Sequence, residues 1–231
     1  MKSVLVAVAM VAGVLAGGTT WGDSSVPEGY RPLEYFDLDG AQWVDTGYFP
    51  KCTDRLEMTV ALPPDRVRDA GTYYALWCTR NGSGAISLSA FLGASSEQAA
   101  ALSTGNPPAG ALRFDRNTVG TTTDVWVAPG ETSHVVVADY GAGACTVDGE
   151  AAYTFPNLDP YIAAGRLVLF ASHKCGLGLD AKASSMDGNW ASYRFFRFRV
   201  FDKTGTLQRD YVPVCKLDET DPLKRYAFMN A

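Results

Sequence analysis

Hydrophobic and polar residues alternate along most of this chain with a period of two, which is typical of β-strands. The alternation is clearest in four stretches, at residues 43–45, 56–60, 86–91 and 125–127. Each stretch is short and ends in turn-forming residues. From residue 30 onward, the pattern therefore predicts a chain made of many short strands.

Two consecutive hairpins are predicted in the middle of the chain. Residues 134–139 are expected to pair with residues 144–147 through the connection at 140–143. Asp148-Gly149 then turns the chain toward a strand at 153–155, because Asp-Gly is a strong hairpin turn signal.

Residues 194–201 form the most regular stretch near the C-terminus. The alternation predicts Phe196, Phe198 and Val200 on one face of a strand. Arg197 and Arg199 fall on the other face as a positive stripe, for which a solvated surface or cross-strand ion pairing is the expectation. A turn at 202–205 should lead into a further strand at 207–214.

Helical patterning is nearly absent. Residues 95–102 are rich in alanine and read as a short helix or a surface loop, ending at the Gly and Pro residues of 105–108. Many short strands with turns about every ten residues predict an all-β protein whose two antiparallel sheets pack face to face, a β-sandwich or jelly roll.

The first 22 residues differ from the rest. Lys2 precedes an apolar run at residues 4–15 and then small residues, which is the layout of a secretory signal peptide. The run is too short for a membrane helix, which needs about 20 apolar residues. We expect a signal peptide at 1–22, a linker at 23–29 and one domain at 30–231, secreted or periplasmic and without membrane insertion.

Composition narrows the classes of partner. The chain has 231 residues, of which 47% are hydrophobic and 19% charged, which suits a globular domain with a core. The net charge of −5 and the lack of long basic runs argue against nucleic acid and anionic membranes as partners. Five cysteines without a CxxC pair, in an exported chain, favour at most two disulfides over a metal or redox motif.

Three stretches carry a resemblance to a known family. They are residues 33–36 with 41–48, residues 167–171, and residues 198–202 running on to 205–213. Together they resemble concanavalin A-like, LamG-like jelly-roll domains of secreted bacterial proteins, in which similar opening and closing motifs bracket the fold. The sequence departs from that pattern at Asp37 and Asp39, where the family more often has small hydroxyl residues.

The resemblance implies a two-sheet antiparallel β-sandwich of the concanavalin A-like jelly-roll type. Lectins, carbohydrate-binding modules, adhesion domains and some glycoside hydrolases use this fold, so it does not decide function. Because the first and last strands of such folds lie near each other, Cys52 is predicted to pair with Cys215. Cys78 is predicted to pair with Cys175, which leaves Cys145 as the odd cysteine.

No catalytic or metal motif stands out. The hydrolases of this fold carry a Glu-x-Asp-x-Glu strand, whereas Glu57 stands alone and is expected to face outward. Asp37 and Asp39 begin like a calcium loop, but its remaining ligands are missing. His134 has no partner at zinc-ligand spacing. We therefore predict no enzyme activity and no cofactor.

Aromatic residues remain as candidates for binding a sugar, whose apolar C–H faces stack on flat side chains. Trp190 follows a polar loop and is predicted as the stacking platform, with polar contacts from Asp187, Asn189 and Arg80. In the alternative, Trp190 folds back to cover the edge of the sandwich.

Two further tryptophans, Trp43 and Trp77, are expected in the core. The sequence thus favours a secreted, non-catalytic, lectin-like carbohydrate-binding module. The alternative is a structural or adhesion domain that contacts another protein at the cell surface through an exposed apolar patch. A glycoside hydrolase comes third.

The signal-peptide assignment predicts a shortened mature protein. When the full chain is produced in a secreting bacterium, we expect cleavage after Gly18, or slightly later near Gly22, because small residues there suit the signal peptidase. Intact-mass measurement of the exported protein checks this. An exported chain that retains residues 1–22 would contradict it.

Overall fold

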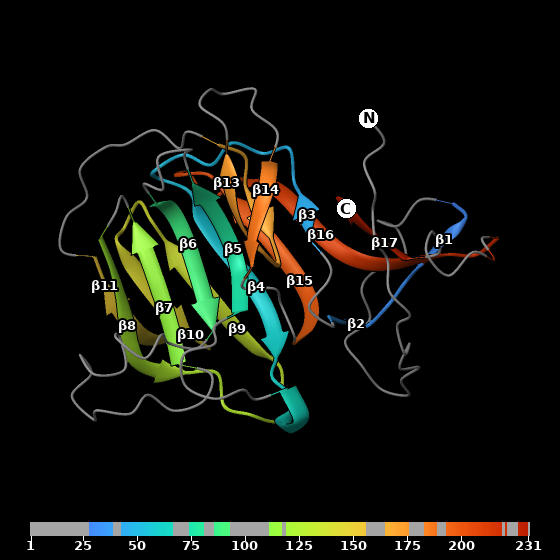
Figure 1. Ribbon diagram of the computed structural model, residues 1–231, viewed down its shortest axis with the longest axis horizontal. Coiled ribbons are helices and arrows are strands. Elements are labelled where there is room, and N and C mark those ends of the chain that lie inside the picture. Colours follow the sequence, from blue (N-terminus) through green and yellow to red (C-terminus); the bar gives the residue numbers. More distant parts are fainter. Residues whose placement is uncertain are drawn as a thin grey trace.

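The computed structural model describes residues 28–38, 43–66, 74–80, 86–92, 111–116, 119–155, 165–175, 183–188, 193–218, 220 and 226–230. Within these ranges the chain is all-β, and the only helical element is the single 3₁₀ turn η2 (Pro64–Arg66). The strands form two antiparallel sheets that pack face to face as a β-sandwich (Figure 1). The predicted all-β, two-sheet architecture is confirmed.

The larger sheet has nine strands and the smaller has six, and their neighbours along each sheet are often distant in sequence. The nine-stranded sheet contains β1 (Tyr30–Pro32), β2 (Phe36–Asp37), β4 (Arg55–Ala61), β9 (His134–Asp139), β10 (Ala144–Val147), β11 (Glu150–Thr154), β15 (Arg194–Phe201), β16 (Leu207–Lys216) and β17 (Tyr226–Asn230). The six-stranded sheet runs in the order β3 (Val44–Asp45), β12 (Val168–Leu169), β5 (Tyr74–Arg80), β6 (Ile86–Leu92), β7 (Ala111–Arg116) and β8 (Val119–Trp126). A separate hairpin pairs β13 (Ser172–Cys175) with β14 (Ala183–Gly188).

The core lies between the inner faces of the two sheets. Each strand contributes alternate residues, as in Leu88, Ala90 and Leu92 of β6, which are all essentially inaccessible to solvent. Trp77 of β5 meets Phe198 of β15 with 5.9 Å between ring centroids, so the sheets interdigitate there. Each fully buried side chain of this size contributes about 1.5–3 kcal/mol.

Three tyrosine hydroxyls cross the interface between the sheets and donate to backbone carbonyls. Tyr140, after β9, donates to the Ser89 carbonyl at 3.2 Å, and Tyr193, before β15, donates to the Ala75 carbonyl at 3.0 Å. Tyr211 of β16 donates to the Thr46 carbonyl at 2.9 Å. In each case the tyrosine belongs to the nine-stranded sheet or a segment next to it. The carbonyl that accepts the bond belongs to the six-stranded sheet or a segment next to it.

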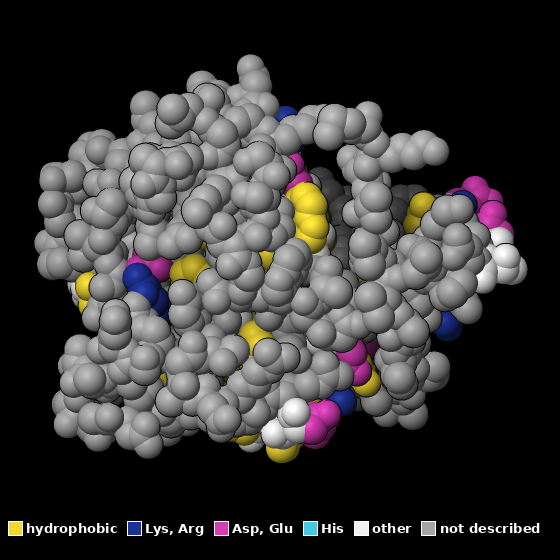
Figure 2. Space-filling view, viewed as in Figure 1, with side chains coloured by type: hydrophobic (Ala, Val, Ile, Leu, Met, Phe, Trp, Pro, Cys, Tyr) yellow, Lys and Arg dark blue, Asp and Glu magenta, His cyan; other side chains and the backbone are white. Residues whose placement is uncertain are grey.

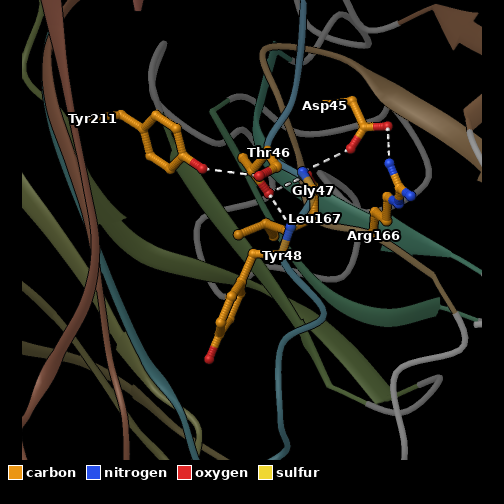
Figure 3. A network of polar contacts seen from close by, with 7 residues as sticks. All are labelled: Asp45, Thr46, Gly47, Tyr48, Arg166, Leu167 and Tyr211. Atoms are coloured by element: carbon orange, nitrogen blue, oxygen red, sulfur yellow. Dashed lines mark hydrogen bonds and ion pairs between the residues drawn. The ribbon is translucent and has the colours of Figure 1, made fainter. Parts of the chain in front are cut away.

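The turn after β3 is a compact hydrogen-bonded unit (Figure 3). The Thr46 amide and hydroxyl both donate to the Leu167 carbonyl, at 3.0 and 2.8 Å, and the Tyr48 amide donates back to the Thr46 hydroxyl. The Gly47 amide donates to Asp45, and Gly47 has φ +66°, a conformation that glycine adopts without strain. Residues 45–48 belong to the stretch at 41–48 that carries the family resemblance, and these bonds give them a structural role in the fold.

The predicted hairpins are confirmed. Strands β9 and β10 pair through residues 140–143, and Asp148 and Gly149 turn β10 into β11 with positive φ values of 51° and 85°. Trp77 is fully buried as predicted, whereas Trp43 is only half-buried. The helix or loop predicted at 95–102 and the signal peptide at 1–22 lie outside the described residues.

The predicted face of Phe196 is wrong. Phe195, Phe198 and Val200 are fully buried, while Phe196 is half-buried and its ring lies 5.6 Å from that of Tyr35. The register between β15 and β4 shifts between residues 195 and 197, and such a bulge changes which side chains face the core. The strict alternation assumed from the sequence ends at this bulge.

The predicted Cys52–Cys215 disulfide is contradicted. Arg55 pairs with Phe201, which pairs with Leu207 at the start of β16, so Cys52 lies near that end of the sheet. Cys215 lies eight residues further along β16, which is roughly 26 Å of strand. A disulfide requires Cα atoms within about 7 Å.

The described cysteines Cys52, Cys78, Cys145 and Cys215 form no disulfide with one another. The predicted Cys78–Cys175 bridge is likewise not seen, since Cys78 is a thiol; the side chain of Cys175 lies outside the described residues. Burial raises the pKa of the Cys145 thiol well above its ordinary value, which makes this cysteine a poor nucleophile.

Tyr140→Phe tests the tyrosine contacts between the sheets. The substitution removes a hydroxyl that donates to the Ser89 carbonyl and accepts from the Trp77 indole N–H at 3.1 Å, so the buried indole N–H loses this partner. We expect a loss of about 1–3 kcal/mol in the free energy of unfolding, measured by urea titration. Tyr153→Phe, which removes a hydroxyl from a half-buried tyrosine, should cost less than about 0.5 kcal/mol. Equal costs for the two variants would contradict the tyrosine contact.

Candidate functional site

The β13–β14 hairpin carries part of the predicted sugar site. Asp187 is the penultimate residue of β14, and Asn189 and Trp190 follow it outside the described residues. Strand β13 packs against β5, whose last residue is Arg80, and the hairpin stands in front of β5 in Figure 1. Asp187 is on the other strand of this hairpin, and Arg80 is at the end of β5 away from Leu76, to which Phe170 bonds just before β13; neither side chain is described.

Beside this hairpin, the outer face of the six-stranded sheet carries an unusual buried polar row. Cys78 of β5 pairs with Ser89 of β6, and Ser89 pairs with Asp115 of β7. All three residues are inaccessible to solvent although they point away from the core. In the adjacent row, Phe91 pairs with Arg113. Burying a carboxylate is costly unless it is paired, so this arrangement needs an explanation.

Asp115 is held by two neighbours. Its Oδ1 accepts from the Arg113 Nε at 2.9 Å and lies 2.8 Å from the Arg113 Nη2, while its Oδ2 accepts from the Ser89 hydroxyl at 2.9 Å. The Asp115 side chain has no exposed surface, whereas 18% of the Arg113 side chain is exposed. The guanidinium therefore lies between the buried carboxylate and the solvent.

The Arg113 guanidinium has N–H groups that do not point at Asp115. A guanidinium has five N–H groups in a planar fork, and two point at Asp115; across the described part of the chain no further partner of Arg113 is found. Figure 2 looks onto this face and shows basic, acidic and apolar side chains together over β6 and β7. The Arg113 guanidinium can thus donate hydrogen bonds from a fixed fork beside the buried cluster of Ala75, Cys78 and Phe91.

Ser89 connects this site to the core. Its carbonyl accepts the Tyr140 hydroxyl, and its own hydroxyl donates to Asp115. The same residue therefore receives a bond from the opposite sheet and orients the carboxylate that orients Arg113. Fixed side chains of this kind lose little entropy when a ligand binds.

No three His, Cys, Asp or Glu side chains among the described residues come close enough together to hold a metal ion. Nor does any helix in the described ranges have the length and apolar character needed to cross a bilayer. The Nδ1 of His134 lies 2.7 Å from an Asp148 carboxylate oxygen, a contact that the sequence spacing did not indicate.

The sequence carries a signal for the Arg113 site, although the residues predicted from it do not include Arg113. In residues 111–116, Arg113 and Asp115 alternate with Leu112 and Phe114, which is the pattern of a strand with one charged face. What the pattern did not indicate is the burial of that charged face. Comparison with known proteins adds nothing here, because no protein-family model matches the chain and a search of curated proteins finds no match.

A double-mutant cycle tests whether Arg113 and Asp115 form a coupled pair. Arg113→Leu leaves the buried Asp115 carboxylate with only the Ser89 hydroxyl, and we expect it to lower the free energy of unfolding by about 3 kcal/mol. The Arg113→Leu/Asp115→Leu double variant should recover at least about 1 kcal/mol relative to the sum of the single losses. Additive losses in urea titrations would show that the pair is not coupled.

Proposed function

We propose that this protein is a secreted, non-catalytic carbohydrate-binding module with a concanavalin A-like jelly-roll topology. The observation that carries the proposal is the Arg113–Asp115 pair on the outer face of the six-stranded sheet, with the guanidinium between a buried carboxylate and the solvent. Sugar hydroxyls accept hydrogen bonds, and the guanidinium that Asp115 holds in place can donate them.

The position of the site supports the same function. The β13–β14 hairpin packs against β5, next to β6 and β7, and leads directly into Asn189 and Trp190. In this proposal Trp190 stacks on the sugar ring, Asp187 and Asn189 contact its hydroxyls, and Arg80 contributes from the end of β5. Arg113 adds the polar anchor that the sequence interpretation lacked.

The two alternatives have less support. A protein-contact domain should expose an apolar patch, but the large exposed hydrophobic residues in the described ranges are Leu207 and Leu217, at the two ends of β16. For a hydrolase, Glu57 and Asp210 would be the candidate carboxylates on the opposite sheet. Their side chains are only 4% and 6% exposed beneath arginines, so neither is open to a substrate.

Glycan-array binding of residues 23–231 tests the proposed function. We expect a specific signal that falls about tenfold or more in Arg113→Gln and in Trp190→Ala, because each change removes a direct sugar contact. Arg31→Gln removes one charge from an exposed position on β1 and should leave the signal unchanged. A silent array, or an Arg113→Gln signal equal to that of the unchanged protein, would contradict the proposal.

A further inference from the structure

The outer face of the nine-stranded sheet carries three arginines over two carboxylates. Arg199 of β15 lies between Glu57 of β4 and Asp210 of β16 in the strand register. Arg199 contacts Glu57 at 2.6 Å, Arg55 also pairs with Glu57, and the Arg197 Nε donates to Asp210 at 2.6 Å. The ion pairing expected for the stripe of Arg197 and Arg199 is confirmed.

The two kinds of charge lie at different depths. The Glu57 and Asp210 side chains are 4% and 6% exposed, whereas those of Arg55, Arg199 and Arg197 are 45%, 35% and 25% exposed. The carboxylates therefore form a lower layer and the guanidinium groups form the surface. A molecule that approaches this face meets the arginines first.

Aromatic contacts fix two of the arginines in place. The guanidinium carbons of Arg55 and Arg199 lie 5.0 and 5.4 Å from the ring centroid of Phe201, within cation–π range. Each of these guanidinium groups is thus held by both a ring and the Glu57 carboxylate. Side chains held in this way lose little rotamer entropy on binding, so the surface is preorganised.

Like charges lie close together in this cluster. Arg55 and Arg199 share the single carboxylate of Glu57, and Asp139 of β9, which lies opposite Arg55 in the strand register, adds a third carboxylate beside the cluster. Burial lowers the pKa of Arg199, and the positive charge of Arg197 lowers it further. An added anion would relieve this repulsion, and a guanidinium fork matches a planar carboxylate in geometry.

We propose that Arg55, Arg197 and Arg199 bind a polysaccharide whose sugars carry carboxylate groups, a polyuronate. Arg197 and Arg199 are two residues apart on one strand, about 7 Å, so the surface offers successive contacts to a polymer. DNA carries one negative charge about every 1.7 Å. A polyuronate is less densely charged, so an acidic protein repels it less than it repels DNA. This surface lies on the other sheet from Arg113 and does not depend on the sugar site there.

Calorimetric titration of residues 23–231 with polygalacturonate at low salt tests the proposal. We expect binding that weakens as salt is added, and binding at least about tenfold weaker to the methyl-esterified polymer, which has the same backbone without the charge. Arg199→Gln should weaken binding about tenfold, and Arg55→Gln several-fold. Arg31→Gln, which removes one positive charge elsewhere, should bind like the unchanged protein. Thermal unfolding of each variant establishes that it is folded.

Four results would overturn the proposal: no binding of polygalacturonate, equal binding of the esterified polymer, equal or tighter binding of duplex DNA, or an unchanged affinity in folded Arg55→Gln and Arg199→Gln. Arg199→Lys is a second control for misfolding. It keeps the positive charge but loses the planar guanidinium fork, so it should bind with intermediate affinity. Since the glycan array reports on Arg113, failure of either proposal leaves the other testable.

Discussion

Three buried tyrosine hydroxyls fix how the two sheets lie on one another, and the rest of the structure depends on that placement. Apolar packing alone is non-directional and tolerates small shifts between sheets. The bonds from Tyr140, Tyr193 and Tyr211 to single carbonyls of the opposite side allow few such shifts. Because a buried donor without a partner costs about 1–3 kcal/mol, other placements of the sheets are disfavoured.

These contacts also reach the outer faces. The Tyr140 hydroxyl bonds to the backbone of Ser89, whose side chain positions Asp115 and, through it, Arg113. On the opposite sheet, Phe198 packs on Trp77 while its neighbours Arg197 and Arg199 point outward over Asp210 and Glu57. In both places a buried carboxylate lies under a partly exposed guanidinium. The core thereby sets the geometry of two polar surfaces that share no residue.

The sequence predicted those features that local chemistry determines. The Asp148-Gly149 turn, the hairpins around it and the strand at 194–201 follow from period-two alternation and turn residues. The bulge after Phe195 could not be predicted, because it depends on the register against β4. The predicted Cys52–Cys215 pair failed for a similar reason, since only the pairing of β4, β15 and β16 shows how far apart these residues lie.

Of the candidate site, the sequence predicted Asp187 of β14, which stays a prediction, and did not indicate the Arg113–Asp115 pair. Alternation shows which residues point away from the core, whereas burial of an outward face depends on what packs over it. The most direct test of the Arg113 site is an NMR titration of residues 23–231 with glucose, galactose, mannose and N-acetylglucosamine in turn. For at least one sugar, the Arg113 side-chain N–H and the β6 and β7 amides should shift in a saturable way. Shifts confined to other strands, or none with any of the four sugars, would contradict a sugar site on this face.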